Sequence, residues 1–434
     1  MQQHAGRMAP AAAAAATAPL RYDTTMLLPL LGRRCPIRAI HQRSLHILAV
    51  ADRREHRAVT LALEQLQRRV PAQATVQFIS TTDGQQTAGV PLPWEIVGWD
   101  TVHPETEVVL AAHWGKGIEG LEDAEVHREI MARCPSLRWL HTMSTGVEHL
   151  PLAALAERGV TTTHHTGVSD APLVEFALAG LLHFSKQLPR VHAAQAARRW
   201  ERFAHRTLAG STLAIVGFGS IGRAIGRAAA NGLGMNVVAV SRRELSPSEL
   251  AAGGATTCAC IGDADGQGGA RSDRLRWALD SVDHVGTQAI PTSSRLYTSL
   301  RVPDGLRLQV VLALPHTVGT AGMVGATELA ALKDGCVLVN VGRGSTVDEA
   351  ALAAALTTRG PGSLSFAGDV FTTEPLPQVS ALWELPNALI SAHCMDWTDD
   401  AVDKAASAWV RNVEGFARSG EVGLEGVVKP HLGY

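Results

Sequence analysis

The chain has 434 residues, 46% of them hydrophobic and 18% charged, a composition that is typical of folded globular proteins and argues against disorder. Its 39 basic and 41 acidic side chains leave a formal net charge of −2, so the composition offers no basic surface for nucleic acid and no polybasic membrane anchor. No apolar run approaches the roughly 18 residues of a membrane-spanning helix, and six scattered cysteines argue against a disulfide framework. Cys258 and Cys260 have no second Cys/His pair near them in sequence, so we expect no metal site.

The first 43 residues differ from the rest of the chain. Residues 1–51 contain six arginines and a single acid, Asp23, together with a run of six alanines at 11–16. An Arg-rich, acid-poor segment indicates a transit peptide, which would place the protein in the mitochondrial matrix or in another organelle. The alternative is a disordered tail on a cytoplasmic protein. In either case residues 1–43 are not expected to belong to the fold.

The remaining chain is too long for one hydrophobic core, which predicts two domains. Four apolar runs in its first part predict buried strands, at residues 44–50, 108–112, 137–142 and 160–163. Residues 58–70 and 172–188 have apolar side chains at helical spacing, so this part reads as an α/β domain with a parallel sheet. We expect the second helix to end at Pro189, before a polar connector that reaches residue 206.

Strand and helix patterns begin again at residue 211. Further buried strands are predicted at residues 212–216, 236–240, 309–314, 336–341 and 364–369, and helices at 325–332 and 348–357. Repeated strand–helix units predict a doubly wound parallel sheet. Residues 253–307 exceed a normal connection and are interpreted as an insertion. A last helix at 398–418 is expected to pack back on the first domain.

The first strand of the second domain runs into a glycine-rich turn, Gly217-x-Gly219-x-x-Gly222, and a helix follows. In this context Gly217 allows the tight turn, Gly219 lets the backbone approach a pyrophosphate, and Gly222 allows close packing of helix and strand. Ser220 and Ile221 begin the helix, whose free N–H groups would bind the anion. The alternative is a tight turn without a ligand.

The end of the next strand bears on the choice of cofactor. Proteins that bind NAD usually carry an acid about 20 residues after the glycine turn, where it binds the ribose 2′-hydroxyl. Here Ser241, Arg242 and Arg243 follow the strand, and a hydroxyl with two guanidiniums suits a 2′-phosphate. We therefore predict NADP, while NAD stays possible if Glu244 binds the ribose instead.

Three charged side chains follow predicted strands farther along the chain. Arg343 lies between glycines, Glu374 precedes a proline, and His393 closes a short apolar run. Ligands of open α/β sheets bind at the carboxyl ends of the strands, so we expect these side chains to form one site. Taken singly, each has another explanation, as a surface arginine, a turn residue or a core histidine.

These motifs, in this order, resemble those of the D-isomer-specific 2-hydroxyacid dehydrogenases, which include glyoxylate/hydroxypyruvate reductases and phosphoglycerate dehydrogenases. The matching segments are residues 144–150, 217–222, 314–320, 340–344 and 369–377, with His393. The resemblance implies two Rossmann-like domains with parallel sheets, in which a nucleotide-binding domain is inserted into a flavodoxin-like substrate-binding domain. The boundaries would be 44–188 with 394–434 for the substrate-binding domain, and 189–393 for the NAD(P)-binding domain.

The resemblance also implies roles for these residues. Arg343 would bind the substrate carboxylate and polarise the carbonyl, because a planar guanidinium can bridge both groups. His393 would protonate the alkoxide during reduction, and Glu374 would pair with it and favour the imidazolium. The substrate loop would contribute backbone N–H groups for the carboxylate, at Thr145, Gly146 and Val147. Cofactor contacts would come from Pro315, Thr320, Val341, Gly342 and Asp369, the last beside the nicotinamide carboxamide.

The implied activity is reduction of a small 2-keto acid, such as glyoxylate or hydroxypyruvate, to the D-2-hydroxy acid by hydride transfer from NADPH. Two alternatives stay open, an NAD-linked dehydrogenase of phosphoglycerate type and a dinucleotide-sensing corepressor-like protein without catalysis. The family further implies a homodimer. The chain departs from the family pattern beside His393, where Ala392 replaces the usual proline and the bulkier residues 394–397 replace small, glycine-rich ones. This departure predicts a substrate pocket of altered shape.

Overall fold

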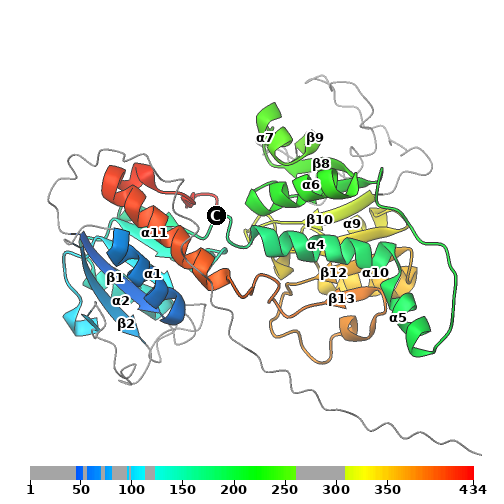
Figure 1. Cartoon of the computed structure of the whole chain (residues 1–434), viewed down its shortest axis with the longest axis horizontal. Helices are drawn as coiled ribbons and strands as arrows, with labels where there is room; N and C mark the ends of the chain where they lie inside the picture. The colour runs from blue at the N-terminus through cyan, green and yellow to red at the C-terminus, as the bar shows by residue number, and fades with distance from the viewer. Residues whose placement is uncertain are drawn as a thin grey trace, which may run out of the picture. The chain divides into compact units, whose positions relative to one another are not determined.

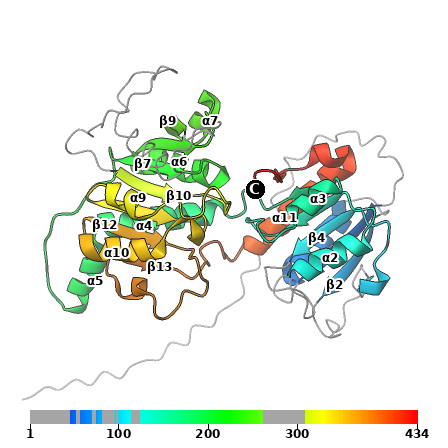
Figure 2. The same cartoon turned by 180° about the vertical axis from the view of Figure 1, so that it is seen from behind.

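The protein is described here from a computed structural model, in which residues 45–51, 56–69, 74–80, 95–96, 99–112, 123–260 and 308–434 are placed. These residues form two sheets whose strands are all parallel, and helices cover both faces of each sheet (Figures 1 and 2). The predicted α/β class with two Rossmann-like domains is confirmed. The predicted targeting segment, residues 1–43, lies outside the described residues.

The first sheet has six strands in the order β3-β2-β1-β4-β5-β6. Their bounds are β1 Leu45–Ala51, β2 Ala74–Ser80, β3 Glu95–Ile96, β4 Val108–Ala112, β5 Trp139–Thr142 and β6 Thr161–Thr163. The central register pairs Ile47 of β1 with both Val76 of β2 and Val108 of β4. Without the two-residue edge strand β3, the chain order is that of a flavodoxin-like sheet, as predicted.

Two pairs of helices cover this sheet. On one face lie α1 (His56–Arg69) and α11 (Ala401–Ser419), and on the other α2 (Asp123–Arg133) and α3 (Leu152–Glu157) (Figures 1 and 2). Helix α1 buries Val59, Ala62, Leu63 and Leu66, which recur at the spacing of one helical face. They pack with Trp409 of α11, so the last helix completes the core of the first sheet, as expected.

The second sheet has seven strands in the order β13-β12-β11-β10-β7-β8-β9. Their bounds are β7 Thr212–Val216, β8 Asn236–Ser241, β9 Ala255–Cys260, β10 Leu308–Leu312, β11 Cys336–Asn340, β12 Leu364–Gly368 and β13 Ala388–Ile390. Central strands such as β10 and β11 are buried along their whole length, as expected for a parallel sheet covered on both faces. The direction of strand order reverses between β7 and β10, and such a switch point is where dinucleotides bind.

Helices α4 (Asp170–Ser185) and α6 (Ser220–Leu233) cover one face of the second sheet, and α9 (Ala326–Ala331) and α10 (Glu349–Arg359) cover the other (Figures 1 and 2). Helix α5 (Leu188–Ala196) follows α4, and α7 (Pro247–Ala252) leads into β9. Short 3₁₀ turns complete the described elements, at η2 Trp99–Thr101, η3 Gly344–Thr346, η4 Ala381–Glu384 and η5 Gly420–Gly423.

Helix α4 corrects two predictions made from the sequence. Its buried residues, among them Phe176 and Leu181, pack with residues of β7 and β11, so the helix belongs with the second sheet and not with the domain 44–188. Pro189 does not end a helix but lies in the first turn of α5. Proline is favoured there because its missing N–H would have no partner inside the helix. The break falls instead at Gln187, whose φ is 51°.

The first residues of the predicted insertion at 253–307 belong to the second sheet. Residues 255–260 form strand β9, which pairs with β8 and closes the edge of the sheet. The remainder, residues 261–307, lies outside the described residues. Within the described part of the chain, no helix combines the length and the apolar character that crossing a membrane requires.

Candidate active site

The three charged side chains predicted to meet come from three neighbouring strands. Arg343 follows β11, Glu374 follows β12 and His393 follows β13, and these strands pair side by side in that order. Because parallel strands share one carboxyl edge, this order delivers all three groups to the same edge of the sheet. The structure thus brings the predicted residues to one place.

The Arg343 guanidinium is held on two sides. Its Nε donates to Glu148 Oε1 at 2.5 Å, and its Nη1 donates to the carbonyl of Gly342 at 2.9 Å. The side chain of Asn340, which is 1% exposed, fixes the backbone below, because it donates to the Arg343 carbonyl and accepts from the Gly342 N–H. The remaining nitrogen, Nη2, makes no hydrogen bond to any residue that the structure describes.

Nη2 lies against the predicted substrate loop. A β-carbon added at Gly146 would come within 1.6 Å of Nη2, so the guanidinium fills the space that a larger residue would occupy. Thr145 and Val147 flank this glycine in the turn that follows β5. The structure therefore joins two segments that were predicted separately, the loop 144–148 and Arg343.

His393 and Glu374 form a pair at the same edge. His393 Nδ1 lies 2.7 Å from Glu374 Oε2, while Glu374 Oε1 accepts from the backbone N–H of Phe371 at 2.9 Å. His393 has a φ of 49°, in the left-handed region that few non-glycine residues adopt, and its side chain is 44% exposed. Such backbone geometry is common at functional sites.

Electrostatics favour an imidazolium at His393. The hydrogen bond to Glu374 raises the pKa of His393 above its ordinary value, although burial and the positive charge of Arg343 oppose the rise. For Glu374 the balance is different. Burial acts to raise the pKa of this carboxyl, but the hydrogen bonds from His393 and from the Phe371 N–H outweigh burial and hold the pKa of Glu374 below its usual range. The pair is thus poised to hold a proton on the ring.

Asp369 has a place that the sequence did not predict. Its carboxylate is 2% exposed and accepts hydrogen bonds from the Ser391 hydroxyl and from the backbone N–H groups of Cys394 and Met395. The carboxylate thus anchors the loop that carries His393. Its place beside the nicotinamide carboxamide stays a prediction.

The glycine turn has the form of a phosphate-binding loop. Gly217 has a φ of 96°, and a β-carbon at Gly222 would come within 2.1 Å of the Gly217 carbonyl oxygen. Gly219 is the N-cap of α6 and provides no side-chain hydrogen bond to the first turn, so the backbone N–H groups there can receive an anion. Ser220 donates to Asp170 of α4, and Ile221 packs in the core. These residues fit the pyrophosphate of a dinucleotide.

Arg242 and Arg243, which were predicted to bind a 2′-phosphate, have different partners. Arg243 forms an ion pair with Glu249, which also completes the capping box of α7 with Ser246. Arg242 instead contacts Tyr434, with the guanidinium carbon 5.1 Å from the ring centre and a hydrogen bond to the hydroxyl. Arg243 is therefore already paired with a carboxylate.

The other predicted cofactor residues lie in two loops at the same edge. Thr320 closes the loop after β10, because its hydroxyl donates to the Pro315 carbonyl at 2.6 Å and accepts from the Thr317 N–H at 2.9 Å. Val341 is buried, and Gly342 lies directly against the backbone of Leu314. The loop after β10 borders the switch point between β7 and β10, and the loop after β11 lies next to it.

Several residues of the site were not found from the sequence. Glu148, Ser169, Asp170 and Asp396 all bond to functional segments that are distant in sequence. Glu148 lies inside the segment 144–150 that was singled out, so its charge was the available signal. Nothing in the sequence around Ser169 or Asp396 indicated the partner of either.

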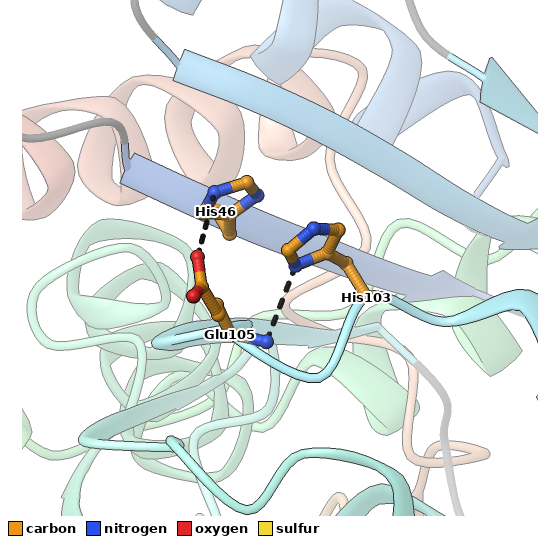
Figure 3. A group of neighbouring side chains, drawn as sticks. All are labelled: His46, His103 and Glu105. Atoms are coloured by element: carbon orange, nitrogen blue, oxygen red, sulfur yellow. Dashed lines mark hydrogen bonds and ion pairs between the residues drawn. The ribbon is translucent and has the colours of Figure 1, made fainter.

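A separate polar cluster lies at the other end of the first sheet, where β1 begins (Figure 3). The rings of His46 and His103 stack with centroids 4.1 Å apart and planes 7° apart, and a Glu105 carboxylate oxygen lies 3.7 Å from His46 Nε2. Nitrogen and oxygen donors of this kind suit zinc, but an ion bonded to imidazole lies in the plane of the ring. One ion cannot lie in the planes of two parallel stacked rings, so the cluster has the geometry of packed side chains.

Comparisons with known proteins agree with the geometry of the site. Residues 178–260 and 308–394 match the family model described as D-isomer specific 2-hydroxyacid dehydrogenase, NAD binding domain. The chain is 28% identical over 315 residues to glyoxylate/hydroxypyruvate reductase B of Yersinia enterocolitica, covering 71% of this chain and 83% of that one. It is 29% identical over 309 residues to (S)-sulfolactate dehydrogenase of Chromohalobacter salexigens, covering 69% of this chain and 84% of the relative.

A solved structure shares the fold. A D-isomer specific 2-hydroxyacid dehydrogenase from Xanthobacter autotrophicus, crystallised in complex with NADPH and MES, matches with a TM-score of 0.62 at 24% identity. The match covers 90% of this chain and all of the other. The two-domain architecture is therefore found in an experimental structure.

Proposed function

Since the chain belongs to the D-isomer-specific 2-hydroxyacid dehydrogenase family, we propose that it reduces a small 2-keto acid of glyoxylate or hydroxypyruvate type to the D-2-hydroxy acid, with NADPH as the preferred cofactor. Membership makes the protein an NAD(P)-dependent oxidoreductase that acts on CH–OH groups. The observation that carries the proposal is the delivery of Arg343, Glu374 and His393 to one sheet edge by three adjacent strands.

Arg343 binds the substrate carboxylate in this proposal. Its Nη2 lies against Gly146, so a carboxylate placed there would receive a charge-assisted hydrogen bond from Nη2 and further bonds from backbone N–H groups of the loop at Thr145–Val147. The positive charge also stabilises the oxygen of the keto group as it gains negative charge. Glu148 holds Nε, so the guanidinium is oriented before the substrate arrives.

His393 supplies the proton. Glu374 keeps Nδ1 engaged and favours the imidazolium, so Nε2 can donate a proton to the alkoxide oxygen during reduction and take it back during oxidation. A nicotinamide cofactor bound beside these residues would supply the hydride. Asp369 and its bonds to the backbone hold the His393 loop in place throughout.

The cofactor is held by the edge of the second sheet. The Gly217–Gly222 turn and the first turn of α6 would hold the pyrophosphate, because the N-cap Gly219 makes no side-chain bond to the first N–H groups of the helix. A preference for NADPH is supported by Ser241, Arg242 and Arg243, which lie at and after the end of β8 and offer a hydroxyl and two guanidiniums to a 2′-phosphate. Arg243 contributes less, because Glu249 pairs with it.

The experiment that tests the proposed function is an assay of the full chain with a panel of 2-keto acids, in which NADPH or NADH is consumed. We expect turnover of glyoxylate or hydroxypyruvate, faster with NADPH. His393→Ala should lower kcat by about 10² to 10⁴, with the Kd for NADPH nearly unchanged, because general acid catalysis contributes roughly that factor. Binding of NADPH without consumption of any acid would contradict catalysis and favour a dinucleotide sensor.

A homodimer is part of the proposal. The segment between α5 and β7 carries Trp200, whose side chain is 93% exposed. Large aromatic side chains are enriched in the buried centres of protein interfaces and are costly to leave in water. An identical subunit that covers this segment would bury the ring.

We also propose import into the mitochondrion or another organelle, supported by the Arg-rich and acid-poor composition of residues 1–43. A fluorescent reporter fused behind these residues should enter an organelle, and a version with the arginines replaced by glutamine should not. Diffuse fluorescence of the unaltered fusion would contradict the proposal and leave the cytoplasm as the location.

A further inference from the structure

A cavity of about 360 Å³ lies at the amino-terminal edge of the second sheet. Three of the residues that line it, Gln309, Val337 and Ser365, are the second residues of β10, β11 and β12. The groups of the candidate active site follow the carboxyl ends of their strands, so the cavity lies at the opposite edge of the same sheet. Ligand pockets in proteins measure roughly 300 to 1,000 Å³, so this cavity can take a small molecule.

The sheet gives the cavity a floor with two buried polar side chains. Val337 pairs with Ser365 in the register of β11 and β12, and Gln309 Oε1 accepts from the backbone N–H of Val337 at 2.8 Å. Gln309 is 3% exposed and Ser365 is 5% exposed. Apolar side chains line the walls, among them Phe184, Leu208, Pro361 and Pro386. A ligand that fits here needs an apolar body as well as a polar group.

The hydroxyl of Ser365 is open to the cavity. It makes no hydrogen bond to any residue that the structure describes, although buried hydroxyls in proteins nearly always have a partner. Its oxygen does not belong to the inaccessible side-chain atoms that lack a partner, and Ser365 lines the cavity, so the oxygen faces into it. The missing partner is therefore to be sought in the cavity itself.

The guanidinium of Arg206 supplies a positive charge at the same place. It lies over Gly335, where an added β-carbon would come within 1.5 Å of Nη1. The Arg206 backbone is held at the end of α4, because its N–H donates to the Ser185 carbonyl at 2.9 Å and its carbonyl accepts from Lys186 Nζ at 3.2 Å. Among the described residues, the guanidinium has no hydrogen-bond or ion-pair partner. A half-buried and well-held guanidinium of this kind can receive an anion.

Two acidic side chains in this part of the fold have other partners. The Asp334 carboxylate accepts from Arg359 at 2.9 Å and attracts Arg206 only over a longer distance. Arg190, which also lines the cavity, donates to Glu201 at 2.8 Å. None of the described residues that line the cavity is acidic. The cavity therefore favours a negatively charged ligand.

We propose that this cavity is a second binding site, which takes a small organic acid whose carboxylate binds Arg206 and Ser365 and whose apolar body packs against Phe184 and Leu208. A planar guanidinium suits a carboxylate, and the free hydroxyl can donate to one of its oxygens. An inorganic anion would gain nothing from the apolar walls, so they favour an organic one. The proposal does not depend on the proposed function, because none of these residues takes part in it.

The test uses 4-fluorobenzoate as the probe, followed by ¹⁹F NMR during titration of the full chain. We expect a Kd of about 1 mM or tighter, as is usual for a ligand of this size. The uncharged 4-fluorobenzamide has nearly the same shape and should bind about tenfold more weakly or less, because it lacks the charge that Arg206 would meet.

Four variants locate the bound probe. Arg206→Gln should raise the Kd about tenfold or more, and Ser365→Ala about threefold to tenfold, as expected for the loss of a charged and of a neutral hydrogen bond. Arg202→Gln removes an exposed arginine of the same segment that does not line the cavity, and it should leave the Kd unchanged. Arg343→Gln, which alters the candidate active site, should leave it unchanged as well. Circular dichroism checks that each variant is folded.

Several outcomes would overturn the proposal. A Kd that rises in Arg343→Gln and not in Arg206→Gln would place the acid in the active site. Equal binding of acid and amide, or displacement of the probe by an equal concentration of inorganic phosphate, would contradict the assigned ligand class. No ¹⁹F signal change up to about tenfold above the expected Kd would show that the cavity holds water only. Each of these results leaves the proposed function in place, since turnover is not part of the measurement.

Discussion

Each charged side chain that would meet the substrate is oriented by a carboxylate. Glu148 holds Arg343 from the first domain, and Glu374 holds His393 from within the second. Long side chains lose conformational freedom when they bind, so prior orientation lowers the cost of forming the complex. The two carboxylates also differ in effect, because only Glu374 changes the proton affinity of a group that transfers a proton.

Glu374→Gln should shift the pH dependence of catalysis. Glu374 raises the pKa of His393, so the imidazolium persists to higher pH than that of an isolated histidine, and reduction slows as the pH rises through this pKa. Without the Glu374 carboxylate the pKa of His393 falls, and the decline in kcat/KM for reduction should begin at lower pH. For oxidation, which needs the neutral ring, activity should begin at lower pH. A pH–rate profile in both directions checks this, and an unmoved alkaline limb would show that another group titrates.

The arginines after β8 should contribute unequally to cofactor choice. Arg242→Ala is expected to weaken NADPH about tenfold or more while NADH changes little, because the loss of a charge-assisted phosphate contact removes roughly 1.5 to 3 kcal/mol. Arg243→Ala should have a smaller effect, since Glu249 already pairs with that guanidinium. Fluorescence titration with both cofactors measures the Kd values. Equal weakening of NADH by Arg242→Ala would remove the 2′-phosphate assignment.

The site depends on close contact between the turn after β5, which belongs to the first sheet, and the side chain of Arg343, which follows a strand of the second sheet. The turn after β5 approaches Arg343 so closely at Gly146 that no β-carbon fits. The loop also carries Glu148, so one short segment both makes room for the guanidinium and binds it. A shift of this loop would therefore move the carboxylate-binding site as a unit.

Gly146→Ala should consequently impair substrate binding more than cofactor binding. The new methyl group would displace Nη2, and the loss of a charge-assisted hydrogen bond predicts a KM higher by about tenfold to a hundredfold. The matched control is Gly232→Ala in α6, where a β-carbon meets nothing within 4 Å. This control should keep the kinetic constants of the wild type. Steady-state kinetics would contradict the assignment if Gly146→Ala left KM unchanged.

Elements with continuous apolar runs could be predicted from the sequence, because burial on both faces of a parallel sheet demands such runs. Strands β1, β4, β7 and β11 are of this kind. Strand β2 was missed, since polar Gln77 interrupts its apolar pattern, and β9 was missed because its ATTCAC sequence is only weakly apolar. The prediction that a helix ends at Pro189 was wrong because proline, which disrupts a helix interior, is also favoured in the first turn of a helix.

Residues of the site could be predicted from the sequence where a charged side chain comes shortly after a predicted strand. Arg343, Glu374 and His393 could be found because each ends a recognisable segment in a fixed order. Their partners could not, because pairing arises only in the folded state: Glu148 lies 195 positions from Arg343, and Ser169 lies 227 positions from Asp396. The ion pair that occupies Arg243 was also invisible in the sequence, although it lies only six positions away.

For the whole molecule, the exposed aromatic side chain between α5 and β7 is the feature that bears on assembly. Trp200 is 93% exposed, whereas Trp139 and Trp409 are completely buried in the first domain. An exposed tryptophan adds little to the stability of a lone subunit, but at an interface it often provides a large share of the binding energy. The proposed homodimer would use it in this way.

Trp200→Ser should therefore shift the protein from dimer to monomer, as measured by light scattering of the column-purified chain. Its thermal stability at high dilution should change little, because the ring makes few contacts within the subunit. Val422→Ser, which removes a 92% exposed apolar side chain from η5 of the first domain, serves as the control and should stay dimeric. A Trp200→Ser variant that remains dimeric would exclude this segment as the interface.

The return of α11 to the first sheet has a consequence for biosynthesis. Residues 401–419 pack on α1, residues 56–69, so one face of that core stays open until residues 401–419 have left the ribosome. The second sheet, whose strands end at Ile390, is fully translated earlier and can fold while the N-terminal strands still wait for their covering helix. A nascent chain halted before residue 401 would expose the apolar faces of Leu63 and Leu66, and would be a natural target for chaperones.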